Sequence, residues 1–375
     1  ELKKKRKVKE DAISILRGIS IRMPLLIYGA DITDEDKELT IDNFTSLVDS
    51  RSWEEFMPKG VSKQRFNAFK KYYDPDIFTA AAKRIRAMAR AADRLSIEER
   101  IERIAAIFAT FRNPDKETVL TPWRVVNMHM SDTLGGYTFF NEDFSETIEE
   151  PRFVDRGDVT AEVFAPDSHL LEINSKSGLY PLYLAYNIYR SRLRDEMFSP
   201  ETLEEHQAIW DAAVAENIFV ICKTPMAKSI TRRTLLGFRK GKTNMWAPED
   251  LINKIKNQPE LFIKKVQDLV GKNVKIKAIV GNPPYQVMDQ GNCTSSTAIY
   301  PLFIEIAQKI NPQNISMITP SKWLTLQGRG LSESWALSVL ESNNIVSIFD
   351  YSNSNDVFPH VEIKGGICYF LIDPT

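Results

Sequence analysis

Apolar residues follow two different spacings along the 375-residue chain, and the change falls near residue 118. Before that point they recur every three or four positions, which is typical of amphipathic helices. The clearest case follows Ser96, where five apolar side chains share one helical face: Ile97, Ile101, Ile104, Ala105 and Phe108. We therefore predict a mainly helical first domain over residues 1–117.

The ends of this helix are marked by known signals. Ser96 and Glu99 have the spacing of a capping box, which predicts a helix start at Ser96. Asn113-Pro114 predicts its end, because the residue before a proline disfavours helical geometry. A second helix is expected over 80–95, and its basic residues are Lys83, Arg84, Arg86, Arg90 and Arg94. An exposed charged face is the main interpretation of that row, with phosphate contacts as the alternative.

After residue 118 short apolar runs alternate with helical segments. Strands are predicted at 169–174, 217–223, 276–282, 315–321, 345–352 and 366–373. One helix is expected to begin at Ser199-Pro200, since proline suits the first helical position, and another, over 297–310, to end at Asn311-Pro312. Alternating strands and helices predict an α/β fold with a doubly wound, mostly parallel sheet over 118–375.

Composition narrows the choice of partners. The 49 basic and 50 acidic residues nearly cancel, so nucleic-acid contacts must come from local patches such as 231–242. The three cysteines are far apart and the four histidines form no ligand pattern, so no metal site is expected. With no signal peptide and no apolar run near 18 residues, we expect a cytoplasmic protein without membrane contact.

The stretch "KAIVGNPPYQ" (277–286) carries the most specific chemistry. An apolar strand stops there on Asn282, two prolines and Tyr285, at the strand end where such sheets bind ligands. An exocyclic amine is a poor nucleophile, and two acceptors that hold its hydrogens would stabilise the developing charge. The Asn282 side-chain oxygen and the Pro283 carbonyl could be those acceptors. Pro284 stiffens the corner, and Tyr285 offers a ring on which a base can stack. The bland alternative is an ordinary turn.

Asn-Pro-Pro-Tyr resembles the catalytic motif of amino-methyltransferases that use S-adenosylmethionine, whose fold is the Rossmann-like class I methyltransferase fold. Other segments resemble motifs of the gamma-class adenine-specific DNA enzymes in the same order: 121–130, 169–185, 217–235 and 358–370. The resemblance implies transfer of a methyl group to the N6 amino group of adenine in DNA.

The resemblance also assigns roles to single residues. It implies cofactor contacts for Thr121, Pro122, Glu172, Asn174, Gly178, Thr224 and Asn282. It implies that Phe358 and Tyr285 sandwich the flipped base. Two positions depart from the family pattern. Lys176 replaces the first glycine of the motif that contains Glu172, and Cys222, Lys223 and Thr224 stand where an acid for the cofactor ribose is usual. Lys277-Ala278 likewise replaces an aspartate of many relatives.

The sequence of residues 111–127 is similar to the corresponding segment of single-chain restriction–modification enzymes of the Type ISP and Type IIG-like kind. That resemblance implies fused helicase and nuclease parts, with a target-recognition domain beyond residue 375. We therefore expect this fragment to bind double-stranded DNA weakly. Two alternatives keep the fold: methylation of a protein glutamine or RNA guanine, and an inactive coupler module. A nuclease is disfavoured, because the Glu-to-Lys spacing at 166–176 is wrong and the Glu-x-Lys at 361–364 lacks a convincing acid at the end of an adjacent strand.

Overall fold

The computed structural model describes residues 2–32, 37–111, 120–195, 197, 199–288, 296–326 and 330–374. Within these ranges seven strands form one central sheet in the order β10-β11-β9-β6-β3-β4-β5. Their bounds are β3 Leu170–Ser175, β4 Ile218–Cys222, β5 Asn244–Trp246, β6 Ala278–Gly281, β9 Asn314–Pro320, β10 Ile345–Tyr351 and β11 Ile367–Ile372. The six expected strands are all present, each within two residues of its expected ends.

The directions of the strands identify the fold. The neighbours β5, β4, β3, β6 and β9 are parallel, and β11 runs antiparallel between β9 and β10. Chain order runs outward from β3 to β4 and β5 on one side and to β6 and β9 on the other, with the last strand, β11, inserted inside β10, so the sheet is doubly wound with its switch point between β3 and β6. This order with one antiparallel strand is that of class I S-adenosylmethionine-dependent methyltransferases, and the predicted fold class is confirmed.

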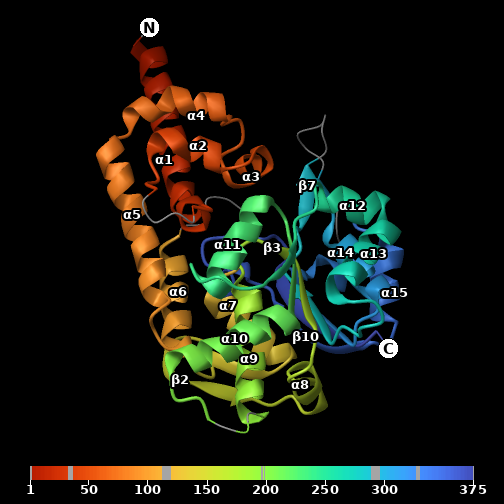
Figure 1. Ribbon diagram of the computed structural model, residues 1–375. Coiled ribbons are helices and arrows are strands. Elements are labelled where there is room, and N and C mark those ends of the chain that lie inside the picture. Colours follow the sequence, from red (N-terminus) through yellow and green to blue (C-terminus); the bar gives the residue numbers. More distant parts are fainter. Residues whose placement is uncertain are drawn as a thin grey trace.

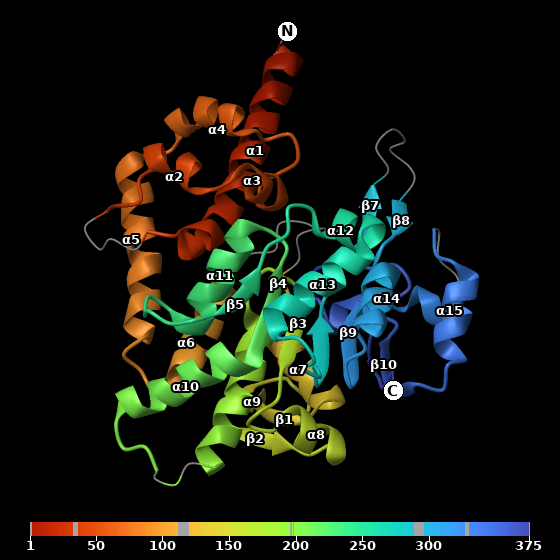
Figure 2. The same cartoon turned by 45° about the vertical axis from the view of Figure 1, so that its right-hand side comes forward.

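Helices cover both faces of the sheet (Figure 1, Figure 2). One face carries α7 Trp123–Thr133, α9 Leu179–Asp195, α10 Leu203–Asn217 and α11 Pro225–Leu236. The other face carries α12 Leu251–Asn257, α13 Pro259–Val270, α14 Tyr300–Ile310 and α15 Glu333–Leu340. Along the buried strands successive residues alternate between the two cores: Leu170 belongs to the first core and Leu171 to the second. Near-continuous apolar strands are thus explained by burial on both sides.

The first part of the chain is helical, as expected, over its described residues. Its helices are α1 Leu2–Gly29, α2 Ile41–Leu47, α3 Ser50–Phe56, α4 Lys63–Phe69, α5 Pro75–Ala92 and α6 Ile97–Thr110. They stand beside the α11 face of the sheet (Figure 1). α1 packs against α5 and α11, and the apolar residues of these helices belong to the same core as the methyltransferase-like part.

The capping box of α6 is formed as predicted, with Ser96 and Glu99 bonding each other's backbone N–H groups. The expected stop at Asn113-Pro114 lies outside the described residues, as does Cys293. The start of α10 differs from the prediction. The helix begins at Leu203, because Thr202 and Glu205 form a second capping box that outweighs Pro200.

Further short elements escaped the sequence pattern. β1 (Gly136–Phe140) pairs with β2 (Thr147–Val154), and β7 (Gln286–Met288) pairs with β8 (Ser296–Ala298). Short segments such as the three-residue β5, β7 and β8 carry too little alternation to be recognised.

The basic row of α5 is in part the expected exposed charged face, since Lys83, Arg84 and Arg94 are exposed, but Arg86 is an exception with a structural role. Arg86 is buried and donates to the backbone carbonyls of Ala30 and Ile32 at 2.9 and 2.7 Å. Burial, followed by the neighbouring Arg233 and Arg90, lowers its pKa to about 10. The guanidinium of Arg233, in the second expected patch, lies 3.5 Å from the ring centre of Phe238 and is also buried. These cations tie α1 and α5 to α11.

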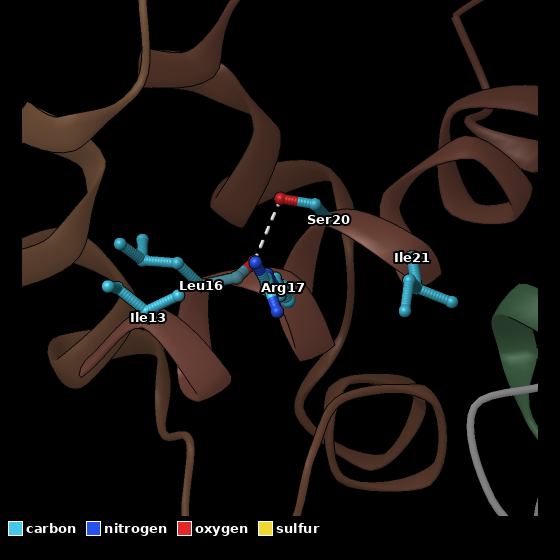
Figure 3. A pocket seen from close by; sticks show the side chains of 5 residues that line it. All are labelled: Ile13, Leu16, Arg17, Ser20 and Ile21. Carbon is cyan, nitrogen blue, oxygen red and sulfur yellow. Dashed lines mark hydrogen bonds between the residues drawn. The ribbon is translucent and has the colours of Figure 1, made fainter. Parts of the chain in front are cut away.

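α1 has two further features. By length and composition its segment Arg6–Gly29 could cross a membrane, with a mean hydropathy of 1.3, a test that core helices of soluble proteins also pass. This finding qualifies the expectation that no such apolar run exists. α1 also carries a small pocket that is separate from the strand ends of the sheet (Figure 3). It is lined by Ile13, Leu16, Arg17, Ser20 and Ile21.

Candidate active site

The Asn-Pro-Pro-Tyr segment forms a corner at the carboxyl end of β6. Gly281 ends the strand where a Cβ atom would lie 2.5 Å from the carbonyl oxygen of Ile173, so only glycine allows β6 to approach β3 here. Pro283 and Pro284 follow without N–H groups and cannot extend the ladder. The corner therefore leaves the sheet directly at Asn282.

Asn282 is held by two segments that are distant in sequence. Its Nδ2 atom donates to Thr121 Oγ1 at 3.0 Å, and its backbone carbonyl accepts from Asn174 Nδ2 at 2.8 Å. Its Oδ1 atom is buried and has no hydrogen-bond partner in the protein. Because buried acceptors are rarely left unpaired, this oxygen is a candidate ligand contact. Three residues that the sequence placed at the site thus lie together.

Tyr285 is half-buried beside this corner, and its hydroxyl has no hydrogen-bond partner. Burial raises its pKa, with the nearby Asn282 side chain opposing the shift. Its backbone carbonyl accepts from the N–H of Ile299 at 3.1 Å, which fixes the end of the corner. Phe358, the expected stacking partner, is 1% exposed and belongs to the core cluster against which Tyr285 packs. A base sandwich between them remains a prediction.

Glu172 lies buried on β3, 4% exposed, with Oε2 unpaired. Burial raises its pKa to about 8, partly offset by Ser175. Tyr180 contributes a further polar group that the sequence did not indicate. Its hydroxyl lies 2.7 Å from His129 Nδ1, and burial, then the nearby Tyr285 and Glu172, raise its pKa. Such a buried tyrosine has no short motif by which it could have been recognised.

Three other expected cofactor residues have visible structural tasks. Gly178 has φ +79°, and a Cβ atom there would lie 2.9 Å from the Cα of Thr231, so it permits α11 to pack against the loop after β3. Thr224 is the N-cap of α11, and its hydroxyl accepts from the N–H of Ala227 at 3.1 Å. Pro122 precedes the first residue of α7. Their cofactor roles remain predictions.

Two lysines that depart from the family pattern form ion pairs with the same carboxylate. Lys176 Nζ and Lys223 Nζ lie 3.2 and 2.9 Å from Glu55 Oε1, on α3 of the helical first part. Glu55 is largely buried, with a side chain 15% exposed. Sequence reasoning missed this residue because "SWEEF" is an ordinary helical segment far from any motif.

The chemistry of these residues fits S-adenosylmethionine. Its amino, hydroxyl and adenine groups form hydrogen bonds, and the strand ends hold buried oxygens that lack a protein partner: Glu172 Oε2, Asn174 Oδ1 and Asn282 Oδ1. All three are on or directly after β3 and β6, the pair at the switch point. Across the described ranges no group of three His, Cys, Asp or Glu side chains could hold a metal ion.

A comparison with protein families identifies the segment that contains this corner. Residues 216–358 match the family of Eco57I restriction-modification methylases. This segment is therefore similar to the Eco57I-type methylases. The matched segment includes β4, β5, β6, β9 and β10, the Asn282 corner and Phe358, whereas β3 and β11 lie outside it.

Among curated proteins, an uncharacterised adenine-specific methylase of Mycoplasma pneumoniae is 34% identical over 102 residues. The match covers 26% of this chain and 24% of that protein, so the chain corresponds to about a quarter of the relative's length.

Solved structures of low sequence identity are also similar to the chain. The alignment with a chain of the DrdV–DNA complex covers 97% of this chain and 36% of that chain, with 13% identity and a TM-score of 0.47. The Type ISP restriction-modification enzyme LlaBIII bound to DNA matches 96% of this chain and 25% of its own, with 12% identity and a TM-score of 0.48. The fold assignment itself rests on the strand order of the sheet.

Proposed function

We propose that this chain transfers a methyl group from S-adenosylmethionine to the N6 amino group of adenine in DNA. The observation that carries the proposal is the unpaired, buried Asn282 Oδ1 at the end of β6, fixed by Thr121. The match of the methylase domain to the Eco57I family supports the reaction type.

The corner has the polarity that an exocyclic amine requires. Asn282 Oδ1 and the Pro283 carbonyl accept the two amine hydrogens and stabilise the positive charge that develops on the nitrogen. The hydrogen bond that Asn282 Nδ2 donates to Thr121 Oγ1 fixes the orientation of the amide, and the Oδ1 atom is left without a protein donor. Because this arrangement exists before substrate arrives, little reorganisation accompanies the reaction.

Tyr285 provides the stacking face for the flipped base, and its ring is held next to the acceptors by the Asn282–Tyr285 sequence itself. Phe358 would complete the stack only after a movement that exposes its ring, because it is 1% exposed in this structure.

The cofactor residues in this proposal are Thr121, Pro122, Glu172, Asn174, Gly178 and Thr224, while Asn282, which the resemblance also assigns to the cofactor, serves mainly the amine. The cofactor supplies the methyl group when bound. Glu172 and Asn174 provide buried oxygens without a protein partner on β3, while Gly178 and Thr224 shape the loop and helix end beside it.

The test is identification of the methylated product. The full-length protein is incubated with S-adenosylmethionine labelled in its methyl group and with duplex DNA, a glutamine-containing peptide or guanine-containing RNA. We expect N6-methyladenine in DNA, detected by mass spectrometry after nucleoside digestion. Label in glutamine or guanine would support those alternative N-methyltransferases, and an absence of cofactor binding would support the inactive coupler.

The activity of the whole protein is part of the proposal. We propose that it belongs to a cytoplasmic restriction–modification enzyme with fused helicase, nuclease and target-recognition parts. The phosphate patches first expected at 231–242 and along α5 are partly committed to internal contacts, as Arg86 and Arg233 illustrate. We therefore expect this chain alone to bind double-stranded DNA weakly at about 150 mM salt, where exposed charges are screened.

A further inference from the structure

A buried carboxylate from the helical first part projects onto the ligand edge of the sheet. Glu55 lies between Lys176, in the loop after β3, and Lys223, directly after β4. The N–H of Lys223 donates to the carbonyl of Ser175 at 3.1 Å, so the two strand ends are joined at this point. Glu55 therefore reaches the carboxyl ends of two parallel neighbours, where ligands bind in such sheets.

α3 is also fixed in this position by hydrogen bonds that do not involve Glu55. Ser52 Oγ accepts the buried N–H of Met226 in the first turn of α11, at 2.9 Å. Arg51 donates to the carbonyls of Pro248 and Glu249. Trp53 is buried and bonds the carbonyl of Val61 through Nε1. The helix thus has anchors of its own, and the placement of Glu55 does not depend on its ion pairs.

The lysines keep this carboxylate charged. Although burial raises the pKa of Glu55, the ammonium groups of Lys176 and Lys223 outweigh that effect and lower the pKa below its usual value. Both lysines approach the same oxygen, Oε1, so Oε2 lies outside these two ion pairs. A charged oxygen of this kind is a strong acceptor for hydroxyl groups.

The strand end itself lacks an acid. β4 ends at Cys222 and is followed by Lys223 and Thr224, the position at which a carboxylate for the ribose of a nucleoside cofactor is usual in α/β folds. Thr224 is occupied as a helix cap. Glu55 brings a carboxylate to this place from α3, and Lys223, which replaces the acid, is the residue that binds it most closely.

We propose that Glu55 is the carboxylate that accepts the ribose hydroxyl groups of the cofactor. The proposal rests on the proposed function, since it names a further binding residue of the same site. It makes the helical first part a component of the cofactor pocket, and it explains both departures: Lys176 and Lys223 orient a carboxylate that the methylase motifs lack.

A purely structural ion-pair cluster is the competing explanation. Buried ion pairs contribute little net stability relative to apolar contacts of similar volume, and α3 already has neutral anchors. A structural role would change the stability of the chain, or the affinity for all nucleosides equally. It would give no selectivity for one hydroxyl group of the ribose, which is the property to measure.

The experiment is calorimetric titration of the full chain with S-adenosylhomocysteine and with its 2′-deoxy and 3′-deoxy analogues. Wild type should lose about tenfold in affinity for at least one analogue, which corresponds to about 1.4 kcal/mol for a hydrogen bond to a charged group. Glu55→Gln should bind S-adenosylhomocysteine about tenfold more weakly, and the penalty for that analogue should largely vanish. Glu54→Gln is the matched control, because Glu54 is exposed on the same helix.

The outcomes separate the two proposals. An equal analogue penalty in wild type and Glu55→Gln would overturn the role of Glu55 while leaving the proposed function intact. A wild type that binds no S-adenosylhomocysteine would overturn both. If Glu55→Gln does not fold, as judged by circular dichroism, Glu55→Asp keeps the charge between the lysines but withdraws the oxygen. It should then show the same reduced penalty, and an unchanged penalty would contradict the proposal.

Discussion

The two strand ends that flank β3, those of β6 and β4, are built in different ways. At the end of β6 the proposed reactive groups follow one another in the sequence, from Asn282 to Tyr285, and partner residues orient Asn282. At the end of β4 the local residues are Cys222, Lys223 and Thr224. The carboxylate beside them is that of Glu55, on α3 in the helical first part of the chain.

The difference shows which part of a site a local motif can encode. Methyl transfer requires two acceptors and a ring in fixed mutual geometry, and a rigid proline corner provides this within four residues. Cofactor binding requires only that an acceptor reach the right volume, so a packed helix can deliver it. The catalytic corner is therefore constrained in sequence, whereas the cofactor edge is constrained in space.

The largest effect is expected at the β6 end. Asn282→Ala removes one preorganised acceptor and should lower the methylation rate by about 100- to 1000-fold. Affinity for S-adenosylhomocysteine should change much less, because the loss concerns the developing charge. Single-turnover methylation by the full-length protein, with calorimetry in parallel, measures both. Equal loss of rate and cofactor affinity would show that Asn282 serves the cofactor rather than the amine.

A somewhat smaller effect is expected at Tyr285. Tyr285→Ala should weaken binding of the flipped base by about 1–3 kcal/mol, the usual contribution of one stacked base, and raise KM for DNA accordingly. Tyr285→Phe is the control: it keeps the ring and removes a hydroxyl that has no protein partner. We expect it to behave nearly as wild type in steady-state kinetics. A large defect in Tyr285→Phe would instead assign the function to the hydroxyl group.

The sequence predicted the elements whose signals are local. Six of the seven strands of the central sheet, the capping box at Ser96 and the corner at Asn282 were all recognised from neighbouring residues. Contacts between distant segments were not predictable. The sequence around Arg86 does not indicate that its guanidinium donates to the backbone carbonyls that follow α1. The sequence around Glu55 likewise does not indicate an ion pair with Lys223. The clustering of Thr121, Asn174 and Asn282 was inferred only through the family resemblance.

Glu172 lies on β3, between the two strands compared, and should make the stability of the protein depend on pH. Its folded-state pKa of about 8 is raised by burial above the unfolded value near 4.5, so it is protonated in the fold at neutral pH. The stability associated with this proton is fully present below about pH 4.5 and is lost as pH rises through about 8. Relative to Glu172→Gln, wild type should lose at least about 1 kcal/mol between pH 5 and 8, since one pKa unit corresponds to about 1.4 kcal/mol. Urea unfolding across this range checks it, and parallel curves for the two proteins would contradict the buried, protonated state.

The smallest effect separates the two explanations of Thr224. Its hydroxyl caps α11 by accepting from Ala227, and loss of such a cap usually costs about 1 kcal/mol. Thr224→Ala should therefore lower the free energy of unfolding by about that amount, while Thr224→Ser, which keeps the oxygen, should restore most of it. If Glu55 serves the β4 end, affinity for S-adenosylhomocysteine should be nearly unchanged in both variants. A Thr224→Ala protein of normal stability but weakened cofactor binding would show that Thr224, rather than Glu55, contacts the ribose. The residues directly after β4 would then bind the ligand themselves, as those directly after β6 are proposed to do.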